Sequence, residues 1–365
     1  MVTMGDCPSH SGSHLICGYL LGDCLLTVRE NAGVSLKLGL DSLRRMTWLV
    51  TGGAGYIGAH VVRAMLDAGH DVAVLDDLST GVATRVDPRA RFVQGSLLDE
   101  QALADAMEGA TGVVHIAAKK QVGESTRDPL YYYRQNVAGL LCLLEACARQ
   151  DVDRFVFSSS CSVYGMPDVD RVHETTELRP ISPYGDTKLT GERMISSYAG
   201  ASRMRAVSLR YFNVAGTGAP ELADPEVFHL IPLIFQAISR DEPVRVFGGD
   251  YPTPDGTCIR DYVHVADVAE AHLVAADALA AGFEGGTFNI GRGVGSSVLE
   301  VIDLTREITG CEIPVSVVDR REGDPARVVA AVEEIQRGLS FTTSRDLAEM
   351  ISSAWSAWPQ PVGRV

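Results

Sequence analysis

From Thr47 onward, short apolar runs alternate with longer stretches in which apolar residues recur every three or four positions. The runs at 48–50 and 72–75 flank a stretch of the second kind at 57–68, which is the pattern of a strand, a helix and a further strand. More apolar runs follow at 91–93, 112–115, 155–157 and 206–209. This alternation predicts an α/β fold built on a doubly wound parallel sheet with right-handed crossovers.

The pattern changes beyond about Asn213. Six prolines fall between 220 and 254, and the apolar runs there are short and mixed in period. We therefore expect a smaller, mixed α/β substrate-binding cap beside the parallel sheet. The predicted domains are a nucleotide-binding domain at 46–213, completed by about 258–295, and a substrate-binding domain at 214–257 and 296–365.

Residues 1–45 show neither a helical nor a strand period. A secretory signal is not indicated, because the apolar stretch His14 to Val28 follows no Lys or Arg and contains Asp23. We expect an N-terminal extension that is either disordered or lies upstream of the true start of translation at Met46.

Composition narrows the function. The 365 residues carry 32 Lys and Arg against 47 Asp and Glu, a net charge of −15, which disfavours binding to nucleic acid or to an anionic membrane. The chain contains no run of 18 uninterrupted apolar residues, so the sequence predicts no membrane-spanning helix. The eight cysteines lack the spacing of metal ligands or of a disulfide framework, so we expect no metal and a reducing, cytoplasmic location.

A glycine-rich turn joins the first strand to the first helix. It reads TGGAGYIG at 51–58, and its glycines permit a tight turn and let backbone N–H groups approach a pyrophosphate at the helix N-terminus. Asp76 ends the second strand, where a carboxylate accepts hydrogen bonds from a ribose diol and repels a 2′-phosphate. The sequence thus predicts a Rossmann-type domain that binds NAD.

Two further segments carry candidate chemistry. The strand at 155–157 delivers Ser158 to Ser160 at its C-terminal end, where open α/β sheets bind their ligands. Tyr184 and Lys188 lie four residues apart, so they share one face of the following helix. An ammonium near a phenol lowers the pKa of the phenol from about 10, which makes Tyr184 a candidate general base. An NAD-binding module without catalysis is the alternative, and it has no need of this pair.

Eight motifs add detail: TGGAGYIGAH at 51–60, LDDLSTG at 75–81, KQVGES at 120–125, FSSSCSVYG at 157–165, SPYGDTK at 182–188, RYFNVAG at 210–216, DYPTPDGTCIRDYVHV at 250–265 and RREGD at 320–324. Together they resemble the extended short-chain dehydrogenase/reductase family, and within it the 4-epimerases of UDP-sugars. The resemblance implies interconversion of UDP-glucose and UDP-galactose through a 4-keto sugar. It also implies a homodimer formed by helices at 129–150 and 182–200.

The same resemblance assigns roles to residues. Tyr184 takes the proton of the sugar O4 while NAD accepts the C4 hydride, Ser160 bonds O4, and Lys188 holds the nicotinamide ribose. The implied cofactor residues are Gly52, Gly55, Tyr56, Ile57, Gly58, Asp76, Ser96, Lys120, Asn136, Tyr184, Lys188 and Tyr211. The implied substrate residues are Ser160, Asn213, His229, Phe247, Arg260, Tyr262, Arg321, Asp324 and Val328.

The chain departs from the family pattern at three of these positions. His229 stands where Asn is common, which leaves its role open, and the uncharged Ser96 replaces an Asp on the adenine side. Val328 stands where the family has a bulky aromatic beside the sugar C2 substituent, which leaves room for an N-acetyl group. UDP-N-acetylglucosamine or a UDP-uronate is the alternative substrate. Cys161 and Ser162 stand where sugar-nucleotide 4,6-dehydratases carry an Asp-Glu pair, which disfavours dehydration.

Overall fold

The computed structural model describes residues 15–20, 23–28, 46–224, 226–321 and 323–359. Its contacts divide the chain into two compact units, Met1–Arg45 and Met46–Val365. In the first unit, strands β1 (Leu15–Leu20) and β2 (Asp23–Val28) pair in antiparallel fashion. The expectation of disorder or a later start concerns mainly residues outside the described ranges, and it stays a prediction.

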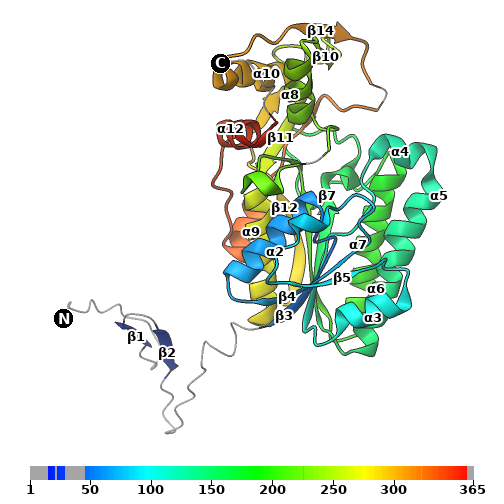
Figure 1. The fold of residues 1–365 in the computed structure, drawn as a ribbon, viewed down its shortest axis with the longest axis vertical. Helices are drawn as coiled ribbons and strands as arrows, with labels where there is room; N and C mark the ends of the chain where they lie inside the picture. The colour runs from blue at the N-terminus through cyan, green and yellow to red at the C-terminus, as the bar shows by residue number, and fades with distance from the viewer. Residues whose placement is uncertain (1–14, 21–22, 29–45, 225, 322, 360–365) are drawn as a thin grey trace. The chain divides into compact units, whose positions relative to one another are not determined.

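A seven-stranded parallel sheet forms the centre of the second unit, in the order β12-β8-β7-β6-β3-β4-β5 (Figure 1). The order reverses between β3 and β6, and ligands of such sheets bind at this point, beyond the C-terminal ends of the strands. The predicted doubly wound, Rossmann-type sheet is confirmed. Its strands are β3 (Thr47–Thr51), β4 (Asp71–Asp76), β5 (Arg91–Gln94), β6 (Gly112–His115), β7 (Arg154–Ser160), β8 (Arg205–Tyr211) and β12 (Gly285–Ile290).

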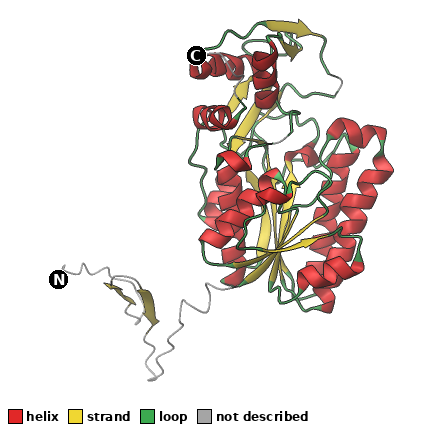
Figure 2. Cartoon of the chain, in the orientation of Figure 1, coloured by secondary structure: helices red, strands yellow, loops and turns green. Residues whose placement is uncertain are grey.

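Helices cover both faces of this sheet (Figure 2). Alternation along β3 explains the two layers, because Trp48 and Val50 pack with α2 and α9, whereas Leu49 packs with α3 and α6. All three side chains are fully buried. The helices are α2 (Tyr56–Asp67), α3 (Glu100–Met107), α4 (Val122–Arg127), α5 (Pro129–Tyr132), α6 (Gly139–Arg149), α7 (Pro183–Ala201), α9 (Val265–Ala280) and α11 (Glu333–Leu339), with the π-helical turn η2 (Tyr133–Ala138) between α5 and α6 and the short 3-10 turns η1 (Ala83–Arg85) and η3 (Cys161–Tyr164).

Short strands and helices form the mixed second part that the sequence predicts. Strand β10 pairs with β14, and β11 lies between β13 and β15 and also pairs with β9. Both parts belong to one compact unit, so the predicted domain boundaries stay predictions. The elements are β9 (Asn213–Ala215), η4 (Pro220–Leu222), α8 (Leu230–Arg240), β10 (Val244–Phe247), β11 (Ile259–His264), β13 (Gly295–Ser297), α10 (Val298–Thr309), β14 (Val315–Val318), β15 (Arg327–Val328) and α12 (Leu347–Ala357).

None of the helices in the described ranges is both long and apolar enough to cross a bilayer.

Candidate active site

The glycine turn after β3 requires its glycines for steric reasons. A Cβ on Gly58 would lie 2.0 Å from the carbonyl oxygen of Gly52, and Gly52 itself has a φ of +74° and packs against the backbone of Ala117. The turn therefore brings β3, the start of α2 and the end of β6 into close approach. A cavity of 370 Å³ lies over it. This volume is within the usual range of small-molecule sites.

Asp76 occupies the predicted place at the end of β4 and lines this cavity. Its Oδ2 accepts a hydrogen bond from the Ala54 N–H at 2.9 Å, and its Oδ1 accepts one from the Leu78 N–H at 2.8 Å. Burial raises the pKa of this carboxyl group, against the effect of the two bonds. Each oxygen of a carboxylate has a second lone pair, so the group retains acceptor capacity for a ribose diol.

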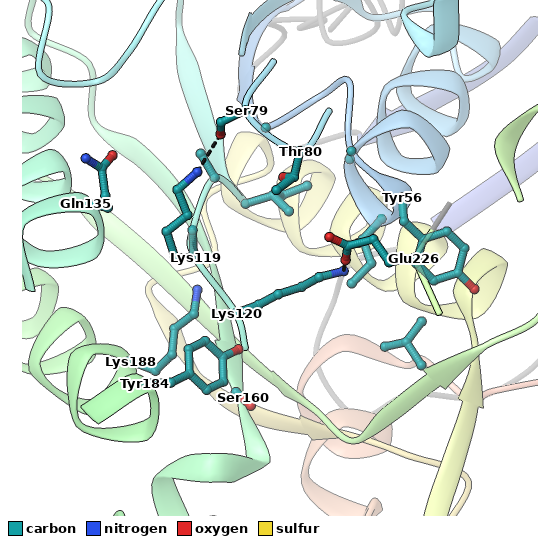
Figure 3. Close-up of a pocket in the computed structure, with 18 of the residues that line it drawn as sticks. Tyr56, Ser79, Thr80, Lys119, Lys120, Gln135, Ser160, Tyr184, Lys188 and Glu226 are labelled. Atoms are coloured by element: carbon teal, nitrogen blue, oxygen red, sulfur yellow. Dashed lines mark hydrogen bonds and ion pairs between the residues drawn. The ribbon is translucent and has the colours of Figure 1, made fainter. Parts of the chain in front are cut away.

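Three predicted catalytic side chains meet at one end of the cavity (Figure 3). Ser160 ends β7, and Tyr184 and Lys188 lie on the first turns of α7. The start of α7 is fixed locally, because Ser182 caps it by accepting the Gly185 N–H and Pro183 follows at the first helical position. The three predicted catalytic residues are nearly fully buried, with 6% of Ser160, 7% of Tyr184 and 3% of Lys188 exposed.

The ionisation of the pair differs from the expectation. Among the groups of the chain, burial raises the pKa of Tyr184 to about 12, although a hydrogen bond with Ser160 lowers it. The predicted lowering by Lys188 is absent in the chain alone, because the amine loses its proton at a lower pH than the phenol does; its hydrogen bond to the Ser158 carbonyl, at 2.7 Å, does not alter that charge. Burial also lowers the pKa of Lys188 to about 7. A phenolate at Tyr184 therefore needs further positive charge in the cavity.

Three lysines line the cavity, although the chain is acidic overall. Lys188 is one, Lys119 bonds the Ser79 hydroxyl, and the Lys120 amine lies 2.6 Å from a carboxylate oxygen of Glu226 (Figure 3). Asp76, Asp77 and Glu226 also line the cavity, so the lysines balance its acidic groups and offer local contacts to an anionic ligand such as a dinucleotide. Sequence analysis missed Lys119 and Glu226. The adjacent lysine of the KK pair could have indicated the first, but no local pattern indicates the second.

The remaining predicted cofactor residues fall into two groups. Asn136 is not among the lining residues of the described chain: within η2, its side chain accepts the Lys119 N–H at 2.8 Å and donates to the Thr187 hydroxyl at 3.0 Å. It thus holds the lysine loop against α7. The residues that do line the cavity are Gly52, Gly55, Tyr56, Ile57, Gly58, Ser96, Lys120 and Tyr211.

The predicted substrate residues divide in a similar way. Asn213 and His229 line the first cavity and also a second one of 490 Å³, which Tyr262 lines too. Tyr262 on β11 is in register with Asn213 on β9, so strand pairing brings these two together. His229 lies close enough to Lys120 for the lysine's charge to contribute to lowering the histidine's pKa, after the larger effect of burial.

The other five substrate residues do not line either cavity in the described chain; they partner one another. Arg260 forms an ion pair with Asp324, and the Arg321 guanidinium lies 3.8 Å from the centre of the Phe247 ring. Val328 on β15 is buried and in register with Arg260 on β11. We call these five residues the arginine cluster. It is near the catalytic end of the first cavity, since the charge of Arg260 acts on the pKa of Cys161, which lines it.

The structure supports the fit of a dinucleotide, through the turn that a Cβ would fill, the free acceptor sites of Asp76 and the lysine lining. No group of three or more metal-ligating side chains lies in the described ranges. The fold and the site define the class: a Rossmann-type dinucleotide-binding protein with a serine, tyrosine and lysine at the cofactor cavity. A family model described as "NAD dependent epimerase/dehydratase family" matches residues 48–291, and the chain belongs to this family. The predicted family resemblance and NAD as cofactor are confirmed at this level.

Proteins of similar sequence and structure support this family assignment. The UDP-glucose 4-epimerase of Corynebacterium glutamicum is 43% identical over 316 residues, which cover 85% of this chain and 95% of that protein. The crystal structure of UDP-glucose 4-epimerase from Brucella ovis in complex with NAD is 40% identical, covers 86% of this chain and 98% of that one, and has a TM-score of 0.81. A UDP-glucose 4-epimerase from Stenotrophomonas maltophila, solved with NAD and formylated UDP-arabinopyranose, has a TM-score of 0.82 at 38% identity and covers 86% of this chain and 97% of that one.

Proposed function

We propose that this protein epimerises UDP-glucose and UDP-galactose at C4 with NAD as a resident cofactor. The observation that carries the proposal is the meeting of Ser160, Tyr184 and Lys188 in the same cavity as the glycine turn and Asp76. The printed names of the similar proteins favour the glucose series over the alternative UDP-N-acetylglucosamine or UDP-uronate substrates. A binding module without catalysis has no use for a buried phenol and amine at this place.

Tyr184 is the general base in this proposal, and Ser160 holds the sugar O4 beside it. When bound, NAD supplies the acceptor and then the donor of the C4 hydride, and its oxidised ring adds positive charge to the cavity. That charge opposes the effect of burial on Tyr184 and favours its phenolate. The phenolate accepts the O4 proton as C4 becomes a ketone, and it returns the proton after the sugar has presented its other face.

The arginine cluster holds the UDP group in this proposal. Arg260 and Arg321 grip the diphosphate, because guanidinium groups bind phosphate oxygens through paired hydrogen bonds. Asp324 accepts the ribose hydroxyls, and Phe247 lies against the uracil. Arg260 must then exchange Asp324 for phosphate. Asn213, His229 and Tyr262 remain candidates for the sugar and phosphate oxygens.

The small side chain of Val328 leads to a separate prediction about which UDP-sugars the enzyme accepts. Its side chain is smaller than an aromatic ring and is buried beside the Arg260 strand. We expect some turnover of UDP-N-acetylglucosamine for this reason. Absence of any product from this sugar at a saturating concentration, with UDP-galactose converted in parallel, would contradict it.

A homodimer and a cytoplasmic location also stay proposals. The helices expected at the dimer interface expose apolar side chains, since Leu130 is 80% exposed and Leu141 is 48% exposed. Light scattering of the purified protein checks the dimer. The five cysteines of the second unit, Cys142, Cys147, Cys161, Cys258 and Cys311, are free thiols, in keeping with a reducing compartment.

The decisive experiment is Tyr184→Phe. We expect the conversion of UDP-galactose, followed by NMR without added NAD, to fall by about 10²- to 10⁴-fold, because this is the usual contribution of a positioned general base to the rate. The matched control is Tyr198→Phe on the same helix, which we expect to keep normal activity. Bound NAD should be unchanged in both variants. A fully active Tyr184→Phe enzyme would overturn the proposal.

A further inference from the structure

A buried carboxylate lies one helical turn beyond Lys188. Glu192 on α7 accepts hydrogen bonds from the Ser159 hydroxyl and from the Arg210 guanidinium, whose Nε and Nη2 lie 2.9 and 2.6 Å from its two oxygens. Ser159 precedes Ser160 on β7, and Arg210 precedes Tyr211 on β8. Glu192 thus ties α7 to the two strands that end at the site.

The hydrogen-bond network of Glu192 continues beyond Arg210. Arg210 also donates from Nη1 to the Tyr164 hydroxyl at 2.8 Å and to the Glu174 carbonyl at 3.2 Å. Only 5% of the Arg210 side chain and 9% of the Glu192 side chain are exposed. Two buried opposite charges with these bonds hold a fixed geometry, and removing one leaves the other uncompensated.

Lys188 occupies a position where a neighbouring charge has a large effect. Lys188 is 3% exposed, and its amine donates to the neutral Ser158 carbonyl. Burial lowers the pKa of Lys188, and the Glu192 charge opposes that change. The titratable and charged groups around the Lys188 amine are Tyr184, Glu192, His115, His272, Tyr211 and Cys161, and those around the Glu192 carboxylate include Arg210, Tyr164 and Glu174. Burial keeps His115 and His272 neutral, since it lowers the pKa of each to about 3 and about 4.

We propose that Glu192 is a positioning residue for the Tyr184–Lys188 pair: it docks α7 on β7 and β8 and sets a carboxylate one helical turn from Lys188. This inference rests on the proposed function. When the pair has lost one proton, that proton can leave either the phenol or the amine. Only the first arrangement gives a base, so a nearby carboxylate that favours the ammonium favours the active arrangement.

The test compares two variants with opposite charge effects. Glu192→Gln removes the negative charge that opposes the effect of burial on Lys188, so we expect the basic limb of the kcat profile to move about one pH unit toward acid. At neutral pH kcat should fall about tenfold, with KM changed less than about threefold. Arg210→Met leaves Glu192 uncompensated, so the limb should move toward alkaline pH. Loss of stability alone cannot move the limb in opposite directions.

Controls separate charge from folding. Glu192→Asp keeps the charge and should keep the wild-type limb even if stability falls. Asp267→Asn removes another buried carboxylate, whose partners are Arg345 and Ser344, and it should lower the melting temperature without moving the limb. A limb that stays in place in Glu192→Gln, or moves the same way in Arg210→Met, would overturn the inference.

A titration without substrate keeps the two proposals apart. The ultraviolet absorbance of the Tyr184 phenolate is obtained by subtracting the Tyr184→Phe spectrum, in the wild-type and Glu192→Gln backgrounds. We expect the phenolate to form at higher pH in Glu192→Gln, and equal titrations would overturn the inference. An inactive wild type or an active Tyr184→Phe would instead contradict the proposed function.

Discussion

The cofactor cavity and the arginine cluster differ in how far they are organised by the chain alone. In the cavity, the turn at Gly52 and Gly58 is fixed by backbone contacts, and Asp76 is held by two N–H groups while still facing the cavity, although Lys120 there is paired with Glu226. In the cluster, Arg260 is bonded to Asp324 and Arg321 is stacked on Phe247, so the binding groups are engaged with one another.

This difference indicates how tightly each site would hold its ligand, NAD in the cavity and the UDP-sugar at the cluster. A site whose groups already have their binding geometry loses little entropy on binding and retains its ligand. A site whose cations are paired internally must exchange partners, which lowers the net gain for each phosphate contact. We therefore expect NAD to remain bound through many turnovers, whereas the UDP-sugar enters and leaves.

Gly58→Ala should have the largest effect on the preformed cofactor cavity. Its Cβ would lie 2.0 Å from the Gly52 carbonyl oxygen, so the turn has to open. We expect NAD affinity to fall by about a hundredfold, or about 3 kcal/mol, as measured by equilibrium dialysis. Gly200→Ala on α7 meets no atom within 4 Å and is the control, expected to bind NAD normally. Normal NAD binding by Gly58→Ala would contradict a preformed turn.

Two adjacent arginines sharpen the other side of the comparison. Arg321→Met removes a proposed diphosphate contact, and we expect KM for UDP-galactose to rise about tenfold to a hundredfold with kcat less affected. Arg320 lies over the Tyr251 ring and pairs with Asp250, so Arg320→Met serves as the matched control. Steady-state kinetics of both variants measure the effect. Equal changes in KM would remove Arg321 from the proposed site.

Asp76→Asn tests the charge that selects the cofactor. The amide no longer repels a 2′-phosphate, and we expect the preference for NAD over NADP to fall about tenfold in competition dialysis. Asp71→Asn, at the opposite and exposed end of the same strand, is the control. An unchanged preference in Asp76→Asn would assign the discrimination to other residues, such as the lysines of the cavity.

The sequence predicts the cofactor side far better than the cluster, and the reason is physical. The sheet follows from alternating hydrophobic periods, and the sites of Asp76, Ser160 and Tyr184 follow from local rules for strand ends and helix starts. The ion pair of Arg260 with Asp324 in the cluster joins segments distant in the chain, so no local pattern predicts it. The raised pKa of Tyr184 is equally inaccessible, because it depends on burial by many neighbours.

Acid stability tests the folding of the cofactor region and not its ligand binding. His115 lies on β6 below the cofactor cavity, is 2% exposed and bonds the Thr51 hydroxyl at 2.7 Å. Burial lowers its pKa to about 3, so below about pH 6.5 the unfolded chain binds a proton that the folded chain does not. Stability is therefore lost as the pH falls from about 6.5 toward 3.

The measurement is the free energy of unfolding in urea at about pH 7.5 and about pH 5. His115 alone should account for a loss of about 2 kcal/mol between them, so His115→Gln should reduce the acid loss by that amount. Asp261 works in the opposite sense, since burial raises its pKa to about 6 and favours the folded state as it protonates. It is present in both proteins and cancels in the comparison. His173→Gln, in an exposed segment, is the control. An acid loss in His115→Gln equal to that of the wild type would show that the folded protein takes up a proton at this histidine, and that the region below the cofactor cavity is less rigid than its geometry indicates.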